Sequence, residues 1–331
     1  MNKKAISLFS GGLDSLLATK IVLEQGVEVV GLHFISSFSA GRGKVRSLQA
    51  EKAASELGIR LIIRDKGTEY LDVVRKPTHG YGRNMNPCID CRIFMLRAAR
   101  SMMEEENAAF VITGEVLGQR PMSQRRHTIG LIEQESGLEG LIVRPLSARL
   151  FPPSLPEKEG LLNRERLLDI AGRSRKMQLE LAKEYELKEY GCPAGGCLLT
   201  DPIYSVKLRE LLLHEPDVAE RDFELLRLGR HLRVDGTKLI LGRNKDENET
   251  LQTLQVHPYA SISPVGFKGP LGLVKGLPGK ATLDIMAQII SFYGRNRATP
   301  VVVELYDGSA RQHVVDRQDI DPEHYRIGEK G

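Results

Sequence analysis

Apolar runs and helical patterns alternate along the first half of the chain. Five short runs rich in apolar and β-branched residues are typical of buried parallel strands: residues 5–9, 27–35, 60–64, 110–114 and 141–146. Apolar positions recur at helical spacing in residues 16–23, 45–57 and 92–106. This alternation predicts an α/β fold with a doubly wound parallel sheet, which binds ligands beyond the carboxyl ends of its strands.

The pattern changes after residue 146. A proline-rich connection over residues 149–156 precedes charged sequence with helical character over 164–187, and helical spacing returns in 205–213 and 218–229. Strand patterns then dominate at 238–241, 271–274 and 300–306, with a polar turn at 242–248 and a Gly/Pro-rich segment at 261–279. Since 331 residues correspond to about two domains, we predict an α/β domain over residues 1–203 and a smaller α+β domain over 204–331.

The turn after the first predicted strand has the composition of a phosphate-binding site. Residues 10–15 read Ser-Gly-Gly-Leu-Asp-Ser and lead directly into the first predicted helix. A helix N-terminus offers backbone N–H groups and a positive dipole end to an anion, and glycines let a polyphosphate approach the backbone. The aspartate could hold Mg²⁺. An ordinary turn capped by the aspartate or a serine is the alternative. The predicted phosphate-binding residues are Ser10, Gly11, Gly12, Asp14 and Ser15.

The charge and the apolar runs of the chain indicate which partners and which cell compartment to expect. The formal net charge of +4 permits a polyanionic partner such as a nucleic acid without requiring one. No run of 18 apolar residues occurs, and the first apolar stretch is interrupted by the glycine turn, which a signal peptide would not allow. We therefore expect a cytoplasmic protein with no membrane partner.

Four cysteines are too few for a disulfide framework in a chain of this length. Cys88 and Cys91 form a C-x-x-C pair just before a predicted helix, whose dipole favours thiolates, and Cys192 and Cys197 are the two others. Thiolates at this spacing suit an iron–sulfur cluster or zinc, and a redox or catalytic pair without metal would have the same spacing. Buried cysteines without a role remain the fourth interpretation.

The glycine turn resembles the PP-loop of the adenine-nucleotide α-hydrolase families, which hold the pyrophosphate of ATP while a substrate oxygen is adenylated. The segment over residues 113–124, followed by Arg144-Pro145-Leu146, resembles the catalytic domain of tRNA 4-thiouridine synthetases. Asn86-Pro87-Cys88 resembles the cysteine motif of tRNA 2-thiouridine synthetases. The likeness covers about residues 5–200. A rhodanese-like tail, a zinc-ribbon quartet and an RNA-binding module ahead of the first strand, which such relatives carry, are missing from this sequence.

The resemblance implies a site at the carboxyl edge of the sheet. ATP and Mg²⁺ would contact the turn and four further residues at that edge: His33, Phe34, Gly114 and Gln119. Cluster-dependent tRNA thiolases bind a [4Fe-4S] cluster through three cysteines, which here implies Cys88, Cys91 and Cys197. Cys197 is favoured over Cys192 because glycines precede it and allow the backbone to approach closely. Zinc is the alternative metal.

The C-terminal part has its own resemblance. Residues 240–249 resemble the small RNA-binding module of NFACT proteins. Several cations lie in Gly- and Pro-containing loops that could follow phosphates, although a solvated surface would look the same. They are Arg243, Lys245, Lys268, Lys275, Lys280, Arg295 and Arg297.

These expectations describe an ATP-dependent tRNA sulfurtransferase that forms AMP and pyrophosphate. A uridine carbonyl oxygen would be adenylated and then replaced by sulfur, with Asp14 and the three cysteines in catalytic roles. The sulfur would come from sulfide or a cysteine desulfurase, and the sequence leaves the modified position and a homodimer open. Two alternatives stay in place: a zinc- or nucleotide-binding factor that associates with RNA, and a sulfurtransferase or amidotransferase acting on a small molecule.

Overall fold

The computed structural model describes residues 3–39, 43–191 and 196–328. The chain divides into two compact units, Met1–Thr200 and Asp201–Gly331. Helix α8 (Pro202–His214) begins directly after this division, and its cap residue Asp201 accepts a hydrogen bond from the Tyr204 backbone N–H at 2.7 Å. A boundary after residue 203 would therefore cut into a helix that is part of the second unit.

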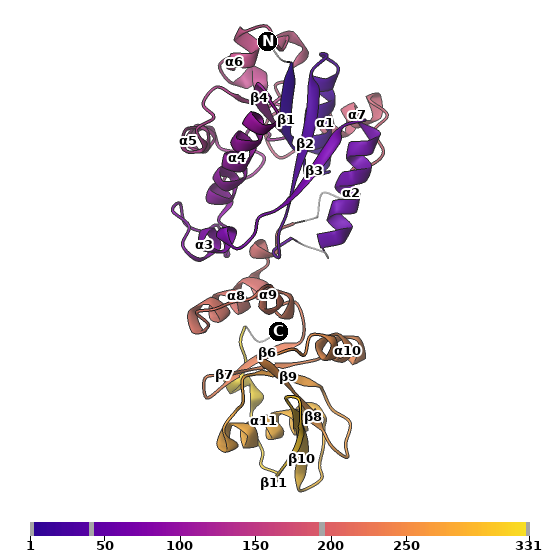
Figure 1. The fold of residues 1–331 in the computed structure, drawn as a ribbon, viewed down its shortest axis with the longest axis vertical. Helices are drawn as coiled ribbons and strands as arrows, with labels where there is room; N and C mark the ends of the chain where they lie inside the picture. The colour runs from indigo at the N-terminus through magenta and orange to yellow at the C-terminus, as the bar shows by residue number, and fades with distance from the viewer. Residues whose placement is uncertain (1–2, 40–42, 192–195, 329–331) are drawn as a thin grey trace. The chain divides into compact units, whose positions relative to one another are not determined.

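The first unit is built on a five-stranded parallel sheet in the order β3-β2-β1-β4-β5 (Figure 1). Its strands are β1 (Lys4–Leu8), β2 (Glu28–Ile35), β3 (Arg60–Asp65), β4 (Phe110–Thr113) and β5 (Ile142–Val143). The predicted α/β fold is confirmed. The strand order reverses at β1, so the loops after β1 and β4 diverge at the topological switch point, where such sheets bind ligands.

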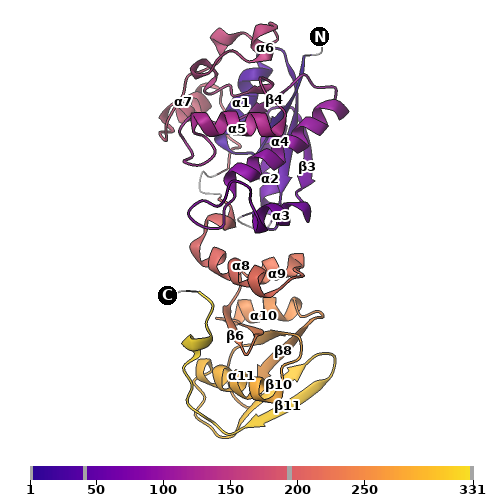
Figure 2. The same cartoon turned by 90° about the vertical axis from the view of Figure 1, so that its left-hand side faces the viewer.

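Helices cover both faces of this sheet (Figure 2). They are α1 (Leu13–Leu23), α2 (Gly43–Glu56), α3 (Glu69–Arg75), α4 (Cys88–Glu105), α5 (Arg126–Ser136), α6 (Leu155–Lys158) and α7 (Lys176–Glu184). Because side chains alternate along a strand, Ala5 and Phe9 pack toward α1, α2 and α7, whereas Ile6 and Leu8 pack toward α4 and α5. Burial of both faces explains the almost continuously apolar strands.

The helical prediction for residues 164–187 holds in two parts and is wrong between them. A 3₁₀ turn, Arg164–Arg166, and helix α7 are separated by extended chain. Backbone N–H groups of Leu168 and Ile170 donate to the carbonyls of Pro145 and Leu146, both at 2.8 Å, and Gly172 turns with φ of 85°. Pairing with the loop after β5 and burial of Leu167 therefore override the local helical pattern.

The second unit contains a six-stranded antiparallel sheet in the order β11-β10-β8-β9-β7-β6, which confirms a smaller α+β unit. The strands are β6 (Arg230–Val234), β7 (Thr237–Leu241), β8 (Tyr259–Pro264), β9 (Gly272–Lys275), β10 (Val301–Tyr306) and β11 (Ala310–Val315). Helix α11 (Lys280–Tyr293) packs on one face. Helices α9 (Glu220–Leu225) and α10 (Lys245–Thr253) contribute Leu225 and Leu251 to the core on the other.

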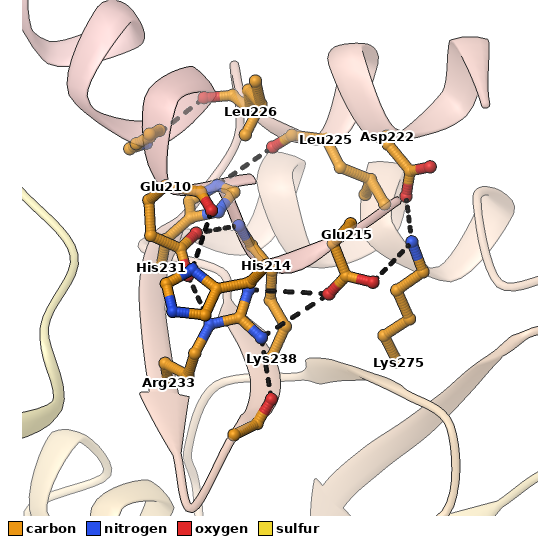
Figure 3. Close-up of polar contacts among 12 residues, drawn as sticks. Glu210, His214, Glu215, Asp222, Leu225, Leu226, His231, Arg233, Lys238 and Lys275 are labelled. Carbon is orange, nitrogen blue, oxygen red and sulfur yellow. Dashed lines mark hydrogen bonds and ion pairs between the residues drawn. The ribbon is translucent and has the colours of Figure 1, made fainter. Parts of the chain in front are cut away.

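Buried charges join helices α8 and α9 to this sheet (Figure 3). Glu210 on α8 is ion-paired with Arg233 and, at 2.6 Å, with Lys238, whose side chain is 1% exposed. Asp222 on α9 accepts a hydrogen bond from the Tyr259 hydroxyl and lies 3.3 Å from the ammonium of Lys275. Lys275, one of the cations that could follow phosphates, is thus half-buried and ion-paired within the unit. None of the helices in the described parts of the chain is long and apolar enough to cross a membrane.

Candidate nucleotide and cysteine site

The turn between β1 and α1 has the geometry of an anion site. Gly11 has φ of 70°, and a Cβ atom there would lie 2.8 Å from the Cα atom of Ala50, so the position requires glycine. Helix α1 starts after Gly12, and no side chain of the described residues caps it. The hydroxyls of Ser10 and Ser15 lie 3.0 Å apart and shape the turn. The first backbone N–H groups of helix α1 are therefore available to an anion.

Two neighbouring strands position this turn. Gly114 directly follows β4, and a Cβ atom there would lie 2.6 Å from the carbonyl carbon of Asp14 and from the nitrogen of Ser15. His33 at the end of β2 is buried, and its Nδ1 lies 2.9 Å from the carbonyl oxygen of Phe9, to which it donates a hydrogen bond. Gly114 and His33 thus lie beside the turn, as the sequence indicates, and Phe34 is half-buried next to His33.

Asp14 has one engaged and one open carboxylate oxygen. Its Oδ2 accepts a hydrogen bond from Gln119 Nε2 at 2.7 Å and lies 3.6 Å from the guanidinium of Arg175. Gln178 Nε2 in turn donates to Gln119 Oε1 at 3.2 Å. The Oδ1 atom of Asp14 is buried and has no hydrogen-bond partner among the residues that the structure describes. An unpartnered buried carboxylate oxygen beside a phosphate turn fits Mg²⁺.

Glu115, next to Gly114, fixes the end of β4. It is 1% exposed and forms ion pairs at 3.0 Å with Arg92 on α4 and Arg144 after β5. Burial raises the pKa of Glu115, but the charges of Arg92 and Arg144 outweigh it and hold that pKa below its usual range. The carboxylate therefore stays ionised and ties three segments together at the ligand-binding edge.

Cys88 and Cys91 begin helix α4, and both are half-buried. Asn86 Nδ2 donates a hydrogen bond to Cys88 Sγ at 3.1 Å, and Lys66 Nζ lies 3.0 Å from Cys91 Sγ. Burial raises the pKa of the Cys91 thiol, but the ammonium of Lys66, the hydroxyl of Tyr70 and the charge of Arg92 outweigh it and lower the pKa overall. These neighbours therefore make the Cys91 thiol more acidic than an ordinary cysteine.

Cys197 reaches the same region from the end of the first unit. Its backbone forms a bridge with Ser39, and the following N–H donates to the carbonyl of Phe38 at 2.9 Å. The pKa of Cys197 is raised to about 11, first by desolvation and then by the charges of Cys91 and Cys88 among others. The three sulfur atoms therefore influence one another. Within the described ranges, however, no three His, Cys, Asp or Glu side chains are close enough to hold a metal ion. Cys192 lies outside the described residues.

Two contacts connect the halves of the site: Arg92, which follows Cys91 on α4, pairs with Glu115 at 3.0 Å, and the neighbouring Gly114 packs against the backbone of Asp14. The sequence indicates the loop after β4 but carries no signal for Lys66, Tyr70, Arg175 or Gln178. The phosphate turn and the cysteines thus belong to one region at the carboxyl edge of the sheet.

Comparisons with known proteins agree with this division of the chain. Residues 1–149 match the family model described as thiamine biosynthesis protein (ThiI), and residues 229–326 match the model of the NFACT protein RNA binding domain. Helices α8 and α9 lie between the two matched segments.

Individual relatives match parts of the chain. The tRNA-specific 2-thiouridylase MnmA of Sulfurimonas denitrificans is 32% identical over 121 residues, which cover 35% of this chain and 36% of that protein. A probable tRNA sulfurtransferase of Thermococcus kodakarensis is 25% identical over 187 residues, 56% of this chain and 44% of that protein. The matched segments span from about a third to under half of these relatives. A crystal structure of a 4-thiouridine synthetase–RNA complex with bound ATP is 23% identical, with a TM-score of 0.42, over 67% of this chain and 52% of that one.

Proposed function

We propose that the protein is an ATP-dependent tRNA-uridine sulfurtransferase. The observation that supports it best is the proximity of two chemistries: Arg92, next to Cys91, pairs with Glu115 at 3.0 Å, and the neighbouring Gly114 packs against the backbone of Asp14 at the phosphate turn. ATP activates the oxygen of a uracil carbonyl group and sulfur attacks the carbon of the same group, so the two sites must adjoin. Relatives of the first unit that are named tRNA sulfurtransferases or 2-thiouridylases support the substrate class.

In the proposed reaction, the turn binds the polyphosphate of ATP through the N–H groups that begin α1. Asp14, through Oδ1, would hold Mg²⁺, which when bound would neutralise charge on the phosphates. The uracil oxygen attacks the α-phosphorus, and the AMP ester that forms is displaced by sulfur. The proposed nucleotide-binding residues are Ser10, Gly11, Gly12, Asp14, Ser15, His33, Phe34, Gly114 and Gln119.

The cysteines are proposed to hold a [4Fe-4S] cluster through Cys88, Cys91 and Cys197, with Cys192 as the alternative third ligand and zinc as the alternative metal. The donor type fits, because thiolates are the usual ligands of such clusters. When bound, the cluster supplies an iron ion that accepts sulfide. Asn86 and Lys66 donate hydrogen bonds to sulfur atoms, which orients the thiolates and stabilises their charge. The sulfur donor is sulfide or a cysteine desulfurase.

The second unit is proposed to hold the RNA. Two of its loops meet, since a Cβ atom at Gly294 would lie 2.7 Å from the carbonyl oxygen of Lys268. The exposed cations Lys268, Arg295 and Arg297 therefore lie on adjacent loops that could contact consecutive phosphates. Arg243 is instead bound to Glu247 by its Nε at 2.9 Å.

The deciding experiment uses anaerobically purified full-length protein. Iron, labile sulfide and zinc are assayed in the wild type and in Cys88→Ala, Cys91→Ala, Cys192→Ala and Cys197→Ala, and pyrophosphate release from ATP is measured with and without tRNA. About four irons per chain, lost in all variants except Cys192→Ala, together with tRNA-dependent pyrophosphate release, would support the proposal. Zinc without iron would refute the cluster, and ATP turnover that ignores tRNA would refute the RNA substrate.

A further inference from the structure

Residues 171–178, which lie outside the ThiI match, pack beside Asp14 and its partner Gln119. Ala171 pairs with Leu117 in a backbone bridge, and the N–H of Gly172 donates to the carbonyl of Leu117 at 2.7 Å. These contacts anchor the start of helix α7 beside the loop after β4. They bring Arg175 to 3.6 Å from Asp14 Oδ2 and Gln178 to 3.2 Å from Gln119.

Two buried oxygen atoms of this arrangement lack a hydrogen-bond partner among the described residues. Gln178 is fully buried, yet its Oε1 has no hydrogen-bond partner among the described residues, and the same holds for Asp14 Oδ1. Buried polar atoms are paired in the great majority of cases, so two unpaired oxygens in one hydrogen-bonded chain, Asp14–Gln119–Gln178, point to a ligand. The Arg175 side chain is 27% exposed, which leaves its guanidinium able to move.

The charges determine what that ligand does to Arg175. Asp14 attracts the guanidinium while its carboxylate carries no cation. A divalent cation on Asp14 would cancel this attraction and repel Arg175, whereas a polyphosphate bound on the adjoining turn would attract it, because arginine binds phosphate oxygens with paired donors.

We propose that Arg175 is a nucleotide-binding residue that leaves Asp14 and binds the polyphosphate of ATP when Mg²⁺ binds Asp14. Gln178 positions the site by orienting Gln119 against the same carboxylate. The inference rests on the proposed function for its nucleotide, but it assigns a role to residues of the segment 171–178 that neither family match covers.

The test measures dissociation constants of the full-length protein for ATP and AMP, with Mg²⁺ or with chelator. Arg175→Ala and Arg175→Gln, which removes the charge but keeps hydrogen-bonding capacity, are compared with Arg173→Ala, an exposed arginine two positions away. We expect both Arg175 variants to bind ATP with Mg²⁺ about 10- to 100-fold more weakly, the range of a charge-assisted contact. AMP binding should change by less than about threefold, and Arg173→Ala should match the wild type.

Equal weakening for ATP and AMP would overturn the inference, since it would show that Arg175 only supports the fold. ATP binding unchanged in Arg175→Ala would overturn it as well, while leaving the proposed function intact. A wild-type protein that binds no ATP would refute both. The expected loss of ATP affinity without sulfur incorporation into tRNA would support Arg175 and refute the proposed reaction alone.

Discussion

Asp14 and Asp222 lie in the first turns of helices in different units and are partnered in opposite ways. Both oxygens of Asp222 are engaged, Oδ1 by the Tyr259 hydroxyl and Lys275 and Oδ2 by the N–H of Ala219 at 2.7 Å. Asp14 offers one oxygen to Gln119 and Arg175, and the other has no hydrogen-bond partner among the described residues. A saturated carboxylate contributes to stability, whereas an unsaturated one in a phosphate turn is prepared for a ligand.

The largest expected effect is the loss of activity in Asp14→Ala. Without a carboxylate to hold Mg²⁺, we expect tRNA-dependent pyrophosphate release to fall by about 10³-fold, as when charge stabilisation is removed from a transition state. The free energy of unfolding should change by less than about 1 kcal/mol, because the carboxylate removed was only partly paired. The control is Asp169→Ala, whose side chain is 53% exposed. Full activity in Asp14→Ala would contradict the interpretation that Asp14 serves ligand binding and Asp222 serves stability.

The second effect is on stability. Asp222→Ala leaves Tyr259 and the N–H of Ala219 without their acceptor and Lys275 with Glu215 as its remaining ion-pair partner. We therefore expect the second unit to lose about 3–5 kcal/mol, as when one partner of a buried ion pair is deleted. Hydrogen exchange of peptides from β8 and β9 in the full chain measures this loss. Asp217→Ala, at an exposed position, should stay within about 0.5 kcal/mol. ATP binding should be unaffected, and a parallel loss of nucleotide affinity would contradict a purely stabilising role.

The place of Asp14 in a phosphate-binding turn could be predicted from the sequence, but its side-chain contacts with distant residues could not. The strand, glycine turn and helix around Asp14 are consecutive in the chain, so local pattern and turn chemistry suffice. The resemblance implies Gln119 at this edge, but its hydrogen bond to Asp14 joins residues 105 positions apart and carries no sequence signal. Lys66 lies 25 positions before Cys91 without any motif around it. Such contacts depend on tertiary packing alone.

Errors in the second unit have a similar cause. The sequence predicts a turn over residues 242–248, yet α10 begins at Lys245, capped by Asn244, with Leu251 as its single fully buried residue. So polar a helix has almost no apolar periodicity to detect. Helix α11 does have this periodicity, in Leu283, Met286 and Ile290, but the neighbouring glycines and prolines obscure it.

A smaller effect tests how Asp14 is positioned. A Cβ atom in Gly114→Ala would press on the backbone of Asp14 and Ser15 at 2.6 Å, so we expect the first unit to lose about 1–3 kcal/mol and ATP affinity to fall with it. Gly130→Ala in α5 is the matched control, because no atom of the described residues would lie within 4 Å of the added methyl group and the helix should gain about 0.5–1 kcal/mol. Unchanged ATP affinity in Gly114→Ala would show that the turn adapts.

The smallest expected effect is an opposite pH dependence of stability in the two units, caused by one histidine in each. His79 lies between Asp90 at 3.1 Å and Glu135 at 2.9 Å; burial lowers the pKa of His79, but these carboxylates outweigh it and raise it overall. Burial, followed by the charges of Lys207 and Lys238, lowers the pKa of His231 well below its usual value. The stability from His79 is therefore complete below about pH 6.5 and is lost as pH rises through its raised pKa, whereas that from His231 is complete above about pH 6.5 and is lost as pH falls.

Hydrogen exchange between pH 5.5 and 8.5, corrected for intrinsic rates, should show these opposite trends in the full chain. Residues 77–87 should become less protected as pH rises, and β6 should become less protected as pH falls, each by at most about 1.4 kcal/mol per pH unit. His79→Gln should flatten the first trend and leave the second, and His231→Gln should do the reverse. Trends of the same sign in both units would mean that general surface charge, rather than these two histidines and their neighbours, sets the pH dependence.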